Sequence, residues 1–126
     1  MDLLYISRCQ FLNTDGVVKA LPAYGDQFWK KFLDVFDSVH ILGEKMKAYL
    51  SNGTVTQLTN PKVTVEIVPG NTLPNEFIHD RQVKKLLAER IKQADAILIK
   101  PSSRKGLMAI RLAEKYHKPY MVDLTG

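Results

Sequence analysis

Blocks of apolar residues alternate with polar segments along the chain, and the clearest example is the last quarter, from Asp95 to Gly126. Ala96–Ile99 is apolar throughout and has the length of a strand, and Tyr120–Leu124 matches it apart from Asp123. Between these runs, apolar residues recur at the spacing of one helical face: Ala109, Leu112, Ala113 and Tyr116. The order strand, helix, strand predicts a βαβ unit of a parallel sheet.

The rest of the chain repeats this alternation. Further strands are predicted at three apolar runs: Leu3–Ile6, Ser38–Leu42 and Val63–Val68. Two further helices are predicted, one over Ala23–Phe36 with Asp26 as its cap and one from Asp80, its cap, to Ala94. The segments between them are predicted as a polar loop over Ser7–Gly16, a short helix over Glu44–Leu50, and a loop or turn between edge strands over Ser51–Pro61.

This order of elements predicts an α/β fold. We expect an open, mostly parallel sheet of about five strands with helices on both faces, formed by a single domain over residues 1–126. Ligands of open α/β sheets bind at the carboxyl ends of the strands. The loops after Lys100 and after Val122 are therefore predicted to carry the function.

The composition is typical of a globular domain, but the net charge does not identify a binding partner. The chain has 126 residues, 45% of them apolar, a net charge of +5 and one cysteine, Cys9. A lone cysteine forms no internal disulfide and suits a reducing compartment. The basic residues are spread along the sequence, which favours solvated helix faces over an anionic membrane surface or a phosphate-bearing substrate. We expect no nucleic-acid partner.

Several families of enzyme are excluded by motifs that the sequence lacks. It contains no G-x-G-x-x-G fingerprint, no P-loop and no G-x-S-x-G elbow. The three histidines and Cys9 do not have the spacing of a metal site, and we expect no metal. A response-regulator receiver would need paired acids after the first strand, where this chain has Ser7 and Arg8.

The polar segment from Ser102 to Gly106 has two interpretations. Ser102, Ser103, Arg104 and Lys105 precede a predicted helix, whose free N–H groups and dipole favour a bound phosphate. The same serines serve equally well as ordinary N-caps. The residues alone leave both interpretations open.

Two runs of this sequence resemble the N-terminal domain of GT-B glycosyltransferases of family 4, in particular bacterial enzymes of surface polysaccharide synthesis. The first, residues 94–126, reads ADAILIKPSSRKGLMAIRLAEKYHKPYMVDLTG, and the second, residues 24–43, reads YGDQFWKKFLDVFDSVHILG. Together they cover about half of the chain in the expected order. The resemblance implies a Rossmann-like, acceptor-side domain of a retaining enzyme, which is truncated at its C-terminal end.

The resemblance also implies where substrates bind. Asn13–Gly16 lies at the family's first loop, Lys100–Ser103 at an arginine-x-proline-serine motif, and Asp123–Gly126 at a glutamate-x-x-glycine motif. Here a lysine replaces the arginine, an aspartate replaces the glutamate, and the first loop has a single glycine. The candidate substrate-binding residues are Asn13, Asp15, Gly16, Lys100, Ser102, Ser103, Arg104, Asp123, Thr125 and Gly126.

In that family the donor and the acceptor are bound by different domains, and this implies the remaining expectations. No catalytic residue or cofactor is expected in this chain, because a missing C-terminal domain or complementary subunit would hold the nucleotide-sugar donor. The expected partners are that domain, a sugar or lipid-linked glycan acceptor and an anionic membrane surface, which suits a cytoplasmic protein at the inner face of a membrane. The alternative hypothesis is a non-catalytic α/β module that docks a partner protein or an anionic membrane.

Overall fold

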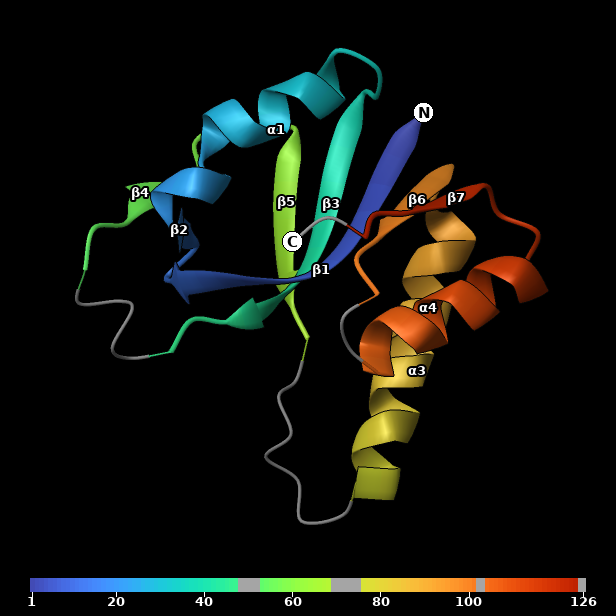
Figure 1. The fold of residues 1–126 in the computed structure, drawn as a ribbon. Coiled ribbons are helices and arrows are strands. Elements are labelled where there is room, and N and C mark those ends of the chain that lie inside the picture. The colour runs from blue at the N-terminus through green and yellow to red at the C-terminus, as the bar shows by residue number, and fades with distance from the viewer. Residues whose placement is uncertain (48–52, 69–75, 102–103, 125–126) are drawn as a thin grey trace.

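Five strands run parallel through the centre of the molecule. The computed structural model describes residues 1–47, 53–68, 76–101 and 104–124 (Figure 1). The parallel strands lie in the order β7 (Tyr120–Val122), β6 (Ala96–Ile99), β1 (Asp2–Thr14), β3 (Ser38–Lys45) and β5 (Val63–Ile67). β1 is central, as its apolar run predicts, because both of its faces are covered.

β1 is much longer than the apolar run that predicts it. It continues through Thr14, turns at Asp15 and Gly16, and pairs antiparallel with β2 (Val17–Ala20), which pairs antiparallel with β4 (Thr56–Gln57). Both turn residues have positive φ, 52° and 84°, as a two-residue hairpin of this twist requires. The predicted loop over Ser7–Gly16 is therefore wrong. Within the described residues the sheet has seven strands and is mixed, whereas the prediction was a mostly parallel one.

One face of the sheet is covered by aromatic side chains around α1 (Asp26–Leu33), which follows the 3-10 turn η1 (Pro22–Tyr24). Trp29 is fully buried, packs edge-on against Tyr5 at a centroid distance of 4.8 Å, and donates its indole N–H to the Tyr24 carbonyl at 2.9 Å. The helix is shorter than predicted, and Gly25 is its N-cap. The Asp26 carboxylate instead accepts hydrogen bonds from Thr59 and from the Asn60 backbone.

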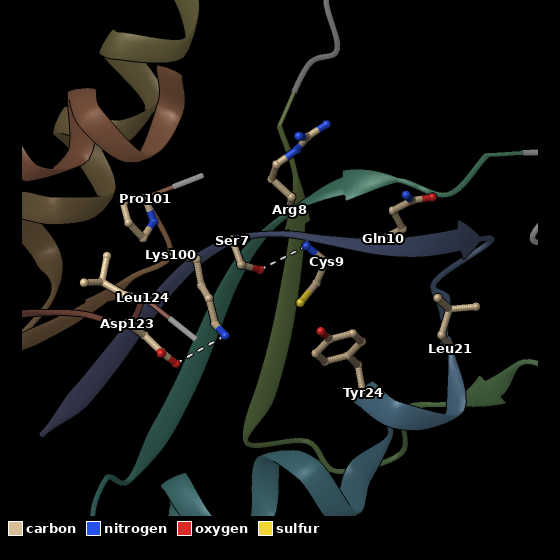
Figure 2. Close-up of a pocket in the computed structure, with 10 residues that line it drawn as sticks. All are labelled: Ser7, Arg8, Cys9, Gln10, Leu21, Tyr24, Lys100, Pro101, Asp123 and Leu124. Atoms are coloured by element: carbon tan, nitrogen blue, oxygen red, sulfur yellow. Dashed lines mark hydrogen bonds and ion pairs between the residues drawn. The ribbon is translucent and has the colours of Figure 1, made fainter. Parts of the chain in front are cut away.

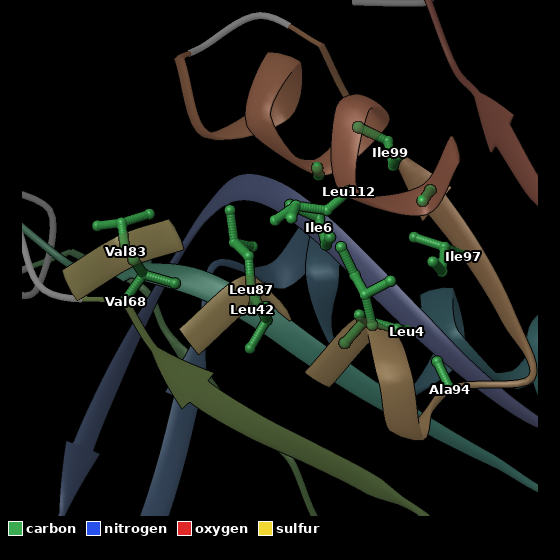
Figure 3. Close-up of a cluster of buried hydrophobic side chains, with 13 residues drawn as sticks. Leu4, Ile6, Leu42, Val68, Val83, Leu87, Ala94, Ile97, Ile99 and Leu112 are labelled. Carbon is green, nitrogen blue, oxygen red and sulfur yellow. The ribbon is translucent and has the colours of Figure 1, made fainter. Parts of the chain in front are cut away.

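The opposite face is covered by α3 (Glu76–Gln93) and α4 (Arg104–Lys115), which enclose an aliphatic core (Figure 3). Leu4, Ile6 and Leu42 of the sheet meet Leu87 and Leu112 of the helices. α3 begins at Glu76, so Asp80 lies inside the helix and is not its cap. Helices thus lie on both faces of the sheet, as predicted.

The predicted helix over Glu44–Leu50 is also wrong at its start. β3 continues through Lys45, so the first residues of this predicted helix belong to a strand. Residues 48–50 lie outside the described part of the chain.

Candidate functional site

A cleft of about 490 Å³ opens at the carboxyl ends of β6 and β7, beside the middle of β1 (Figure 2). This is the edge of the sheet at which α/β proteins bind ligands. Its size falls in the range of small-molecule sites. It is lined by residues that follow β6 and β7, residues of the middle of β1 and residues of the turn before α1: Ser7, Arg8, Cys9, Gln10, Leu21, Tyr24, Lys100, Pro101, Asp123 and Leu124.

An ion pair joins the ends of β6 and β7 at the wall of the cleft. Lys100 Nζ lies 3.2 Å from Asp123 Oδ2, and both side chains are partly buried. The Lys100 backbone N–H donates to the Ile6 carbonyl at 2.9 Å, and the Asp123 N–H donates to the Ile99 carbonyl at the same distance. The backbone hydrogen bonds of the sheet therefore continue to these two residues and fix the positions of their Cα atoms. A neighbouring ammonium and carboxylate can donate to and accept from the hydroxyl groups of one ligand.

A bulge in β1 forms the second wall. The register between β1 and β3 shifts between Ile6 and Gln10, and the Cys9 N–H donates to Ser7 Oγ at 3.1 Å. The Ser7 carbonyl accepts a hydrogen bond of 2.6 Å from Lys105 Nζ. Arg8 Nε lies 3.2 Å from Glu44 Oε2. Lys105 of α4 and Glu44 of β3 thus hold the bulge in place. The bulge turns Ser7 and Cys9 toward the cleft (Figure 2).

Lys105 is the buried cation of the site. Only 8% of its surface is exposed, and burial lowers the pKa of its amine to about 8, although nearby Glu44 opposes that shift. Gly106 lets this first turn of α4 approach the strand end, because a Cβ there would lie 2.8 Å from the Lys100 carbonyl oxygen. Lys105 does not line the cleft, and it contacts the site through the Ser7 carbonyl.

The floor of the cleft is made by Cys9 and Tyr24, which share a side-chain hydrogen bond. Burial raises the pKa of the Cys9 thiol, and the proximity of the Cys9 sulfur together with burial raises the pKa of the Tyr24 hydroxyl. Both groups therefore stay protonated at neutral pH, and the thiol is not activated as a nucleophile. Their surroundings suit binding of a ligand rather than covalent chemistry.

Among the predicted site residues that the structure describes, Lys100 and Asp123 are the two that line the cleft together. Arg104 lies outside the lining of the cleft, and its guanidinium pairs with Asp80 of α3. Ser102, Ser103, Thr125 and Gly126 lie outside the described residues. Their roles, like that of Lys100 and Asp123, stay predictions.

Asn13, Asp15 and Gly16 do not lie in a loop at the carboxyl end of a parallel strand, and this expectation is corrected. Asn13 pairs with Val18 inside the hairpin, and Asp15 and Gly16 form its turn, on the far side of the sheet from α4 (Figure 1). None of the three lines the cleft. The sequence reasoning missed Arg8, Gln10, Leu21 and Tyr24; Arg8 and Gln10 alternate with the apolar Cys9 and Phe11, which is the signal of a half-exposed strand.

A second polar cluster joins β3, β5 and α3 away from the cleft. His40 Nδ1 lies 2.6 Å from Thr64 Oγ1, and His40 Nε2 lies 3.0 Å from Glu66 Oε1. Arg90 donates two hydrogen bonds to the same carboxylate, at 2.7 and 3.0 Å, and so lowers the pKa of Glu66. This network fastens α3 to the sheet. The described residues contain no group of three metal-binding side chains.

Comparison with known proteins finds one related sequence. No protein-family profile matches the chain. It is 27% identical over 105 residues to protein CapJ of Staphylococcus aureus, an alignment that covers 82% of this chain and 26% of CapJ. The chain therefore spans about a quarter of the length of the relative it matches.

A solved structure resembles the fold. The C-terminal domain of a hydrogenase from Pyrococcus furiosus superposes with a TM-score of 0.50 and 16% identity, over 98% of this chain and 91% of that domain. This likeness concerns the fold alone. Among the described helices, none has the length and apolar character needed to cross a membrane.

Proposed function

We propose that this chain is the Rossmann-like, acceptor-side domain of a glycosyltransferase that acts in polysaccharide biosynthesis. The observation that carries the proposal is the cleft at the carboxyl ends of β6 and β7, beside the middle of β1, with the Lys100–Asp123 pair in its wall. The similarity to CapJ supports a polysaccharide context. The resemblance of residues 94–126 and 24–43 to family 4 glycosyltransferases supports the reaction class.

In this proposal the cleft binds an acceptor sugar and the donor is held elsewhere. Lys100 donates to and Asp123 accepts from hydroxyl groups of the sugar, while Tyr24 and Leu21 offer an apolar surface to its ring. Cys9 and Tyr24 stay protonated, so neither supplies a nucleophile. Transfer then needs a second domain or subunit that carries the nucleotide-sugar.

A non-catalytic binding module is the competing function. The cleft residues include no activated nucleophile, which suits a domain that only binds. The two hypotheses differ in what occupies the cleft, since a docking module would use an outer face instead.

The test is a titration of the ¹⁵N-labelled chain followed by NMR. The probe is an N-acetylhexosamine linked through pyrophosphate to a short prenyl chain. We expect amide shifts at Ser7–Gln10, Lys100 and Asp123, and we expect the Lys100→Met and Asp123→Asn variants to lose most of the affinity. Asn13→Ala and Asp15→Asn, at the tip of the hairpin, are the matched controls and should bind normally.

Two results would count against the proposal. Shifts confined to the outer faces of α1 or α3 would favour the docking module. Turnover of a panel of nucleotide-sugars by the purified 126-residue chain alone would show that the donor site is not on another domain.

A further inference from the structure

The net charge of this protein is concentrated in two helices. α3 and α4 together contain nine basic and four acidic residues, which gives them a net charge of +5. The whole chain has 18 basic and 13 acidic residues, so the remainder holds nine of each and is neutral. The sequence order hides this separation, because basic residues occur in every part of the chain.

The two helices lie side by side and run in the same direction over one face of the sheet (Figure 1). At one end Arg104 of α4 pairs with Asp80 of α3. At the other end the Lys92 ammonium lies 4.8 Å from the ring centre of Tyr116, just beyond the end of α4. Their outward sides therefore form one continuous surface.

That surface is basic along both helices. On α4 the exposed residues recur at i, i+3, i+7 and i+11, which is one stripe of a helix, and exposed Glu114 lies at the edge of this stripe. On α3 the exposed basic residues also fall on one side. The resulting basic face consists of Arg81, Lys84, Lys85, Lys92, Arg104, Leu107, Arg111 and Lys115. Among the described side chains, three acids of the two helices lie on or beside it: Asp80 pairs with Arg104, Glu114 accepts a hydrogen bond from Tyr120 at its far edge, and the exposed Glu89 lies one helical turn from Lys85 and from Lys92.

We propose that the basic face docks this protein onto a membrane surface rich in anionic phospholipid. Seven cations spread over two helices match a flat, repeating array of lipid phosphates. Leu107, 55% exposed, lies within the α4 stripe between Arg104 and Arg111, where it can reach the apolar boundary below the headgroups.

The same face fits nucleic acid poorly. Binding of a single strand uses exposed aromatic rings as stacking platforms. None of the described residues that form the basic face is aromatic. At its margin the Lys92 and Lys115 ammonium groups cover the ring of Tyr116 at 4.8 and 5.5 Å, and the Tyr120 hydroxyl is hydrogen-bonded to Glu114.

Docking through the basic face would fix the orientation of the cleft relative to the membrane. The carbonyl of Lys100, in the wall of the cleft, packs against the first turn of α4 at Gly106, so the cleft borders one end of the basic face. A lipid-linked ligand held by the membrane would thus reach the cleft from its rim. The surface itself is independent of the proposed acceptor site and is tested separately.

The experiment is vesicle co-sedimentation with matched charge variants. The variant K84Q/K85Q/R111Q/K115Q removes four charges from the basic face, and the control K19Q/K30Q/K45Q/K62Q removes four exposed charges elsewhere. Each variant is tested on vesicles of phosphatidylcholine alone and of phosphatidylcholine mixed with phosphatidylglycerol. Loss of one lysine or arginine near such a surface weakens binding about five-fold.

We expect the wild type to bind the mixed vesicles only, the basic-face variant to lose at least about a hundred-fold in affinity, and the control to bind like the wild type. Salt near about 1 M should abolish binding because it screens the charges. Equal losses in both variants, or equal binding to uncharged vesicles, would overturn the proposal. So would tighter binding of duplex DNA than of vesicles, or full competition by free glycerophosphoglycerol.

A dye at the interface gives a second readout that needs only a folded chain. The L107C variant carries an environment-sensitive fluorophore, since the native Cys9 is buried and reacts slowly. We expect a blue shift of its emission on mixed vesicles and no shift for the same dye on K30C, on the opposite face. A shift at K30C but not at L107C would place the contact on α1 and contradict the basic face.

Discussion

The two faces of the sheet are built from different side chains, although one strand supplies both. Along β1, Leu3, Tyr5 and Phe11 point to the α1 side, while Leu4 and Ile6 point to the α3 and α4 side. The α1 side is aromatic, with Trp29, Phe28 and Phe32 around Tyr5. The buried core on the other side consists of Leu, Ile, Val and Ala (Figure 3).

The difference explains why the two faces need different amounts of helix. α1 has 8 residues, yet it covers its face because each aromatic ring buries about 150–250 Å². The aliphatic face requires helices of 18 and 12 residues. The larger helical layer also provides a broad outer surface, and that surface carries the net charge.

The strongest disruption of the aromatic face is Trp29→Ala. It removes a fully buried indole, three ring contacts and a hydrogen bond to Tyr24, and we expect a loss of about 4 kcal/mol in the free energy of unfolding. The measurement is urea denaturation. The control is Val35→Ala, a 70% exposed residue just past the helix, which should change stability little. A loss below about 1 kcal/mol would contradict the central role of this ring.

The matching disruption of the aliphatic face is Leu87→Ala, with an expected loss of about 3 kcal/mol. Combining it with Trp29→Ala sharpens the comparison, because the sheet separates the two sites. The losses should add within about 0.5 kcal/mol. A clear deviation from additivity would mean that the two cores respond to each other through β1.

The two faces should also respond oppositely to alkaline pH. The pKa of Lys105 is lowered to about 8, so between that pH and its unfolded value the unfolded chain holds more protons and stability rises with pH. Burial raises the pKa of Cys9 and of Tyr5 on the aromatic face, so the folded chain keeps protons that the unfolded chain releases, and stability falls with pH.

The variant Lys105→Met isolates the contribution of the buried Lys105 amine to the pH dependence of stability. Relative to this variant, the wild type should gain about 2 kcal/mol in unfolding free energy between about pH 7 and pH 10. Lys85→Met, an exposed substitution on α3, should leave the pH profile unchanged. Parallel pH profiles of wild type and Lys105→Met would show that the buried amine does not titrate in this window.

The smallest expected effect concerns the hydrogen bonds between Arg90 of α3 and Glu66 of the sheet. Glu66→Gln weakens the hydrogen bonds from Arg90 and the contact with His40, and we expect a loss of about 1 kcal/mol at neutral pH. Because Arg90 lowers the pKa of Glu66, this contribution is present above the unfolded pKa and disappears as the pH falls through the lowered value. Wild type and variant should therefore converge in acid, whereas Glu89→Gln should match the wild type throughout.

The fold could be predicted from sequence wherever a strand is apolar on both sides. Ala96–Ile99 and the helix after it follow directly from their periodicity, and the closeness of Lys100 to Asp123 follows from the pairing of β6 with β7. The second half of β1 was missed because Arg8, Gln10 and Asn13 give it the composition of a loop.

The candidate site was only partly predictable, for two physical reasons. Lys105 is buried by its contact with the Ser7 carbonyl, which depends on a bulge that no local pattern marks. Tyr24 and Leu21 reach the cleft from the turn before α1, which is far from Lys100 in sequence. The basic face was also hidden, since only the side-by-side packing of α3 and α4 gathers its residues.

The central position of β1 has a consequence for biosynthesis. Leu3 pairs with Ala96, so this part of β1 lacks its β6 neighbour until 93 more residues have been synthesised. At ribosomal rates of about 5–20 residues per second, this delay lasts roughly 5–20 s. The other neighbour, β3, also follows this run in the chain, so Leu3–Ile6 keeps an open edge toward β6 throughout the delay and can be bound by chaperones that recognise short apolar segments.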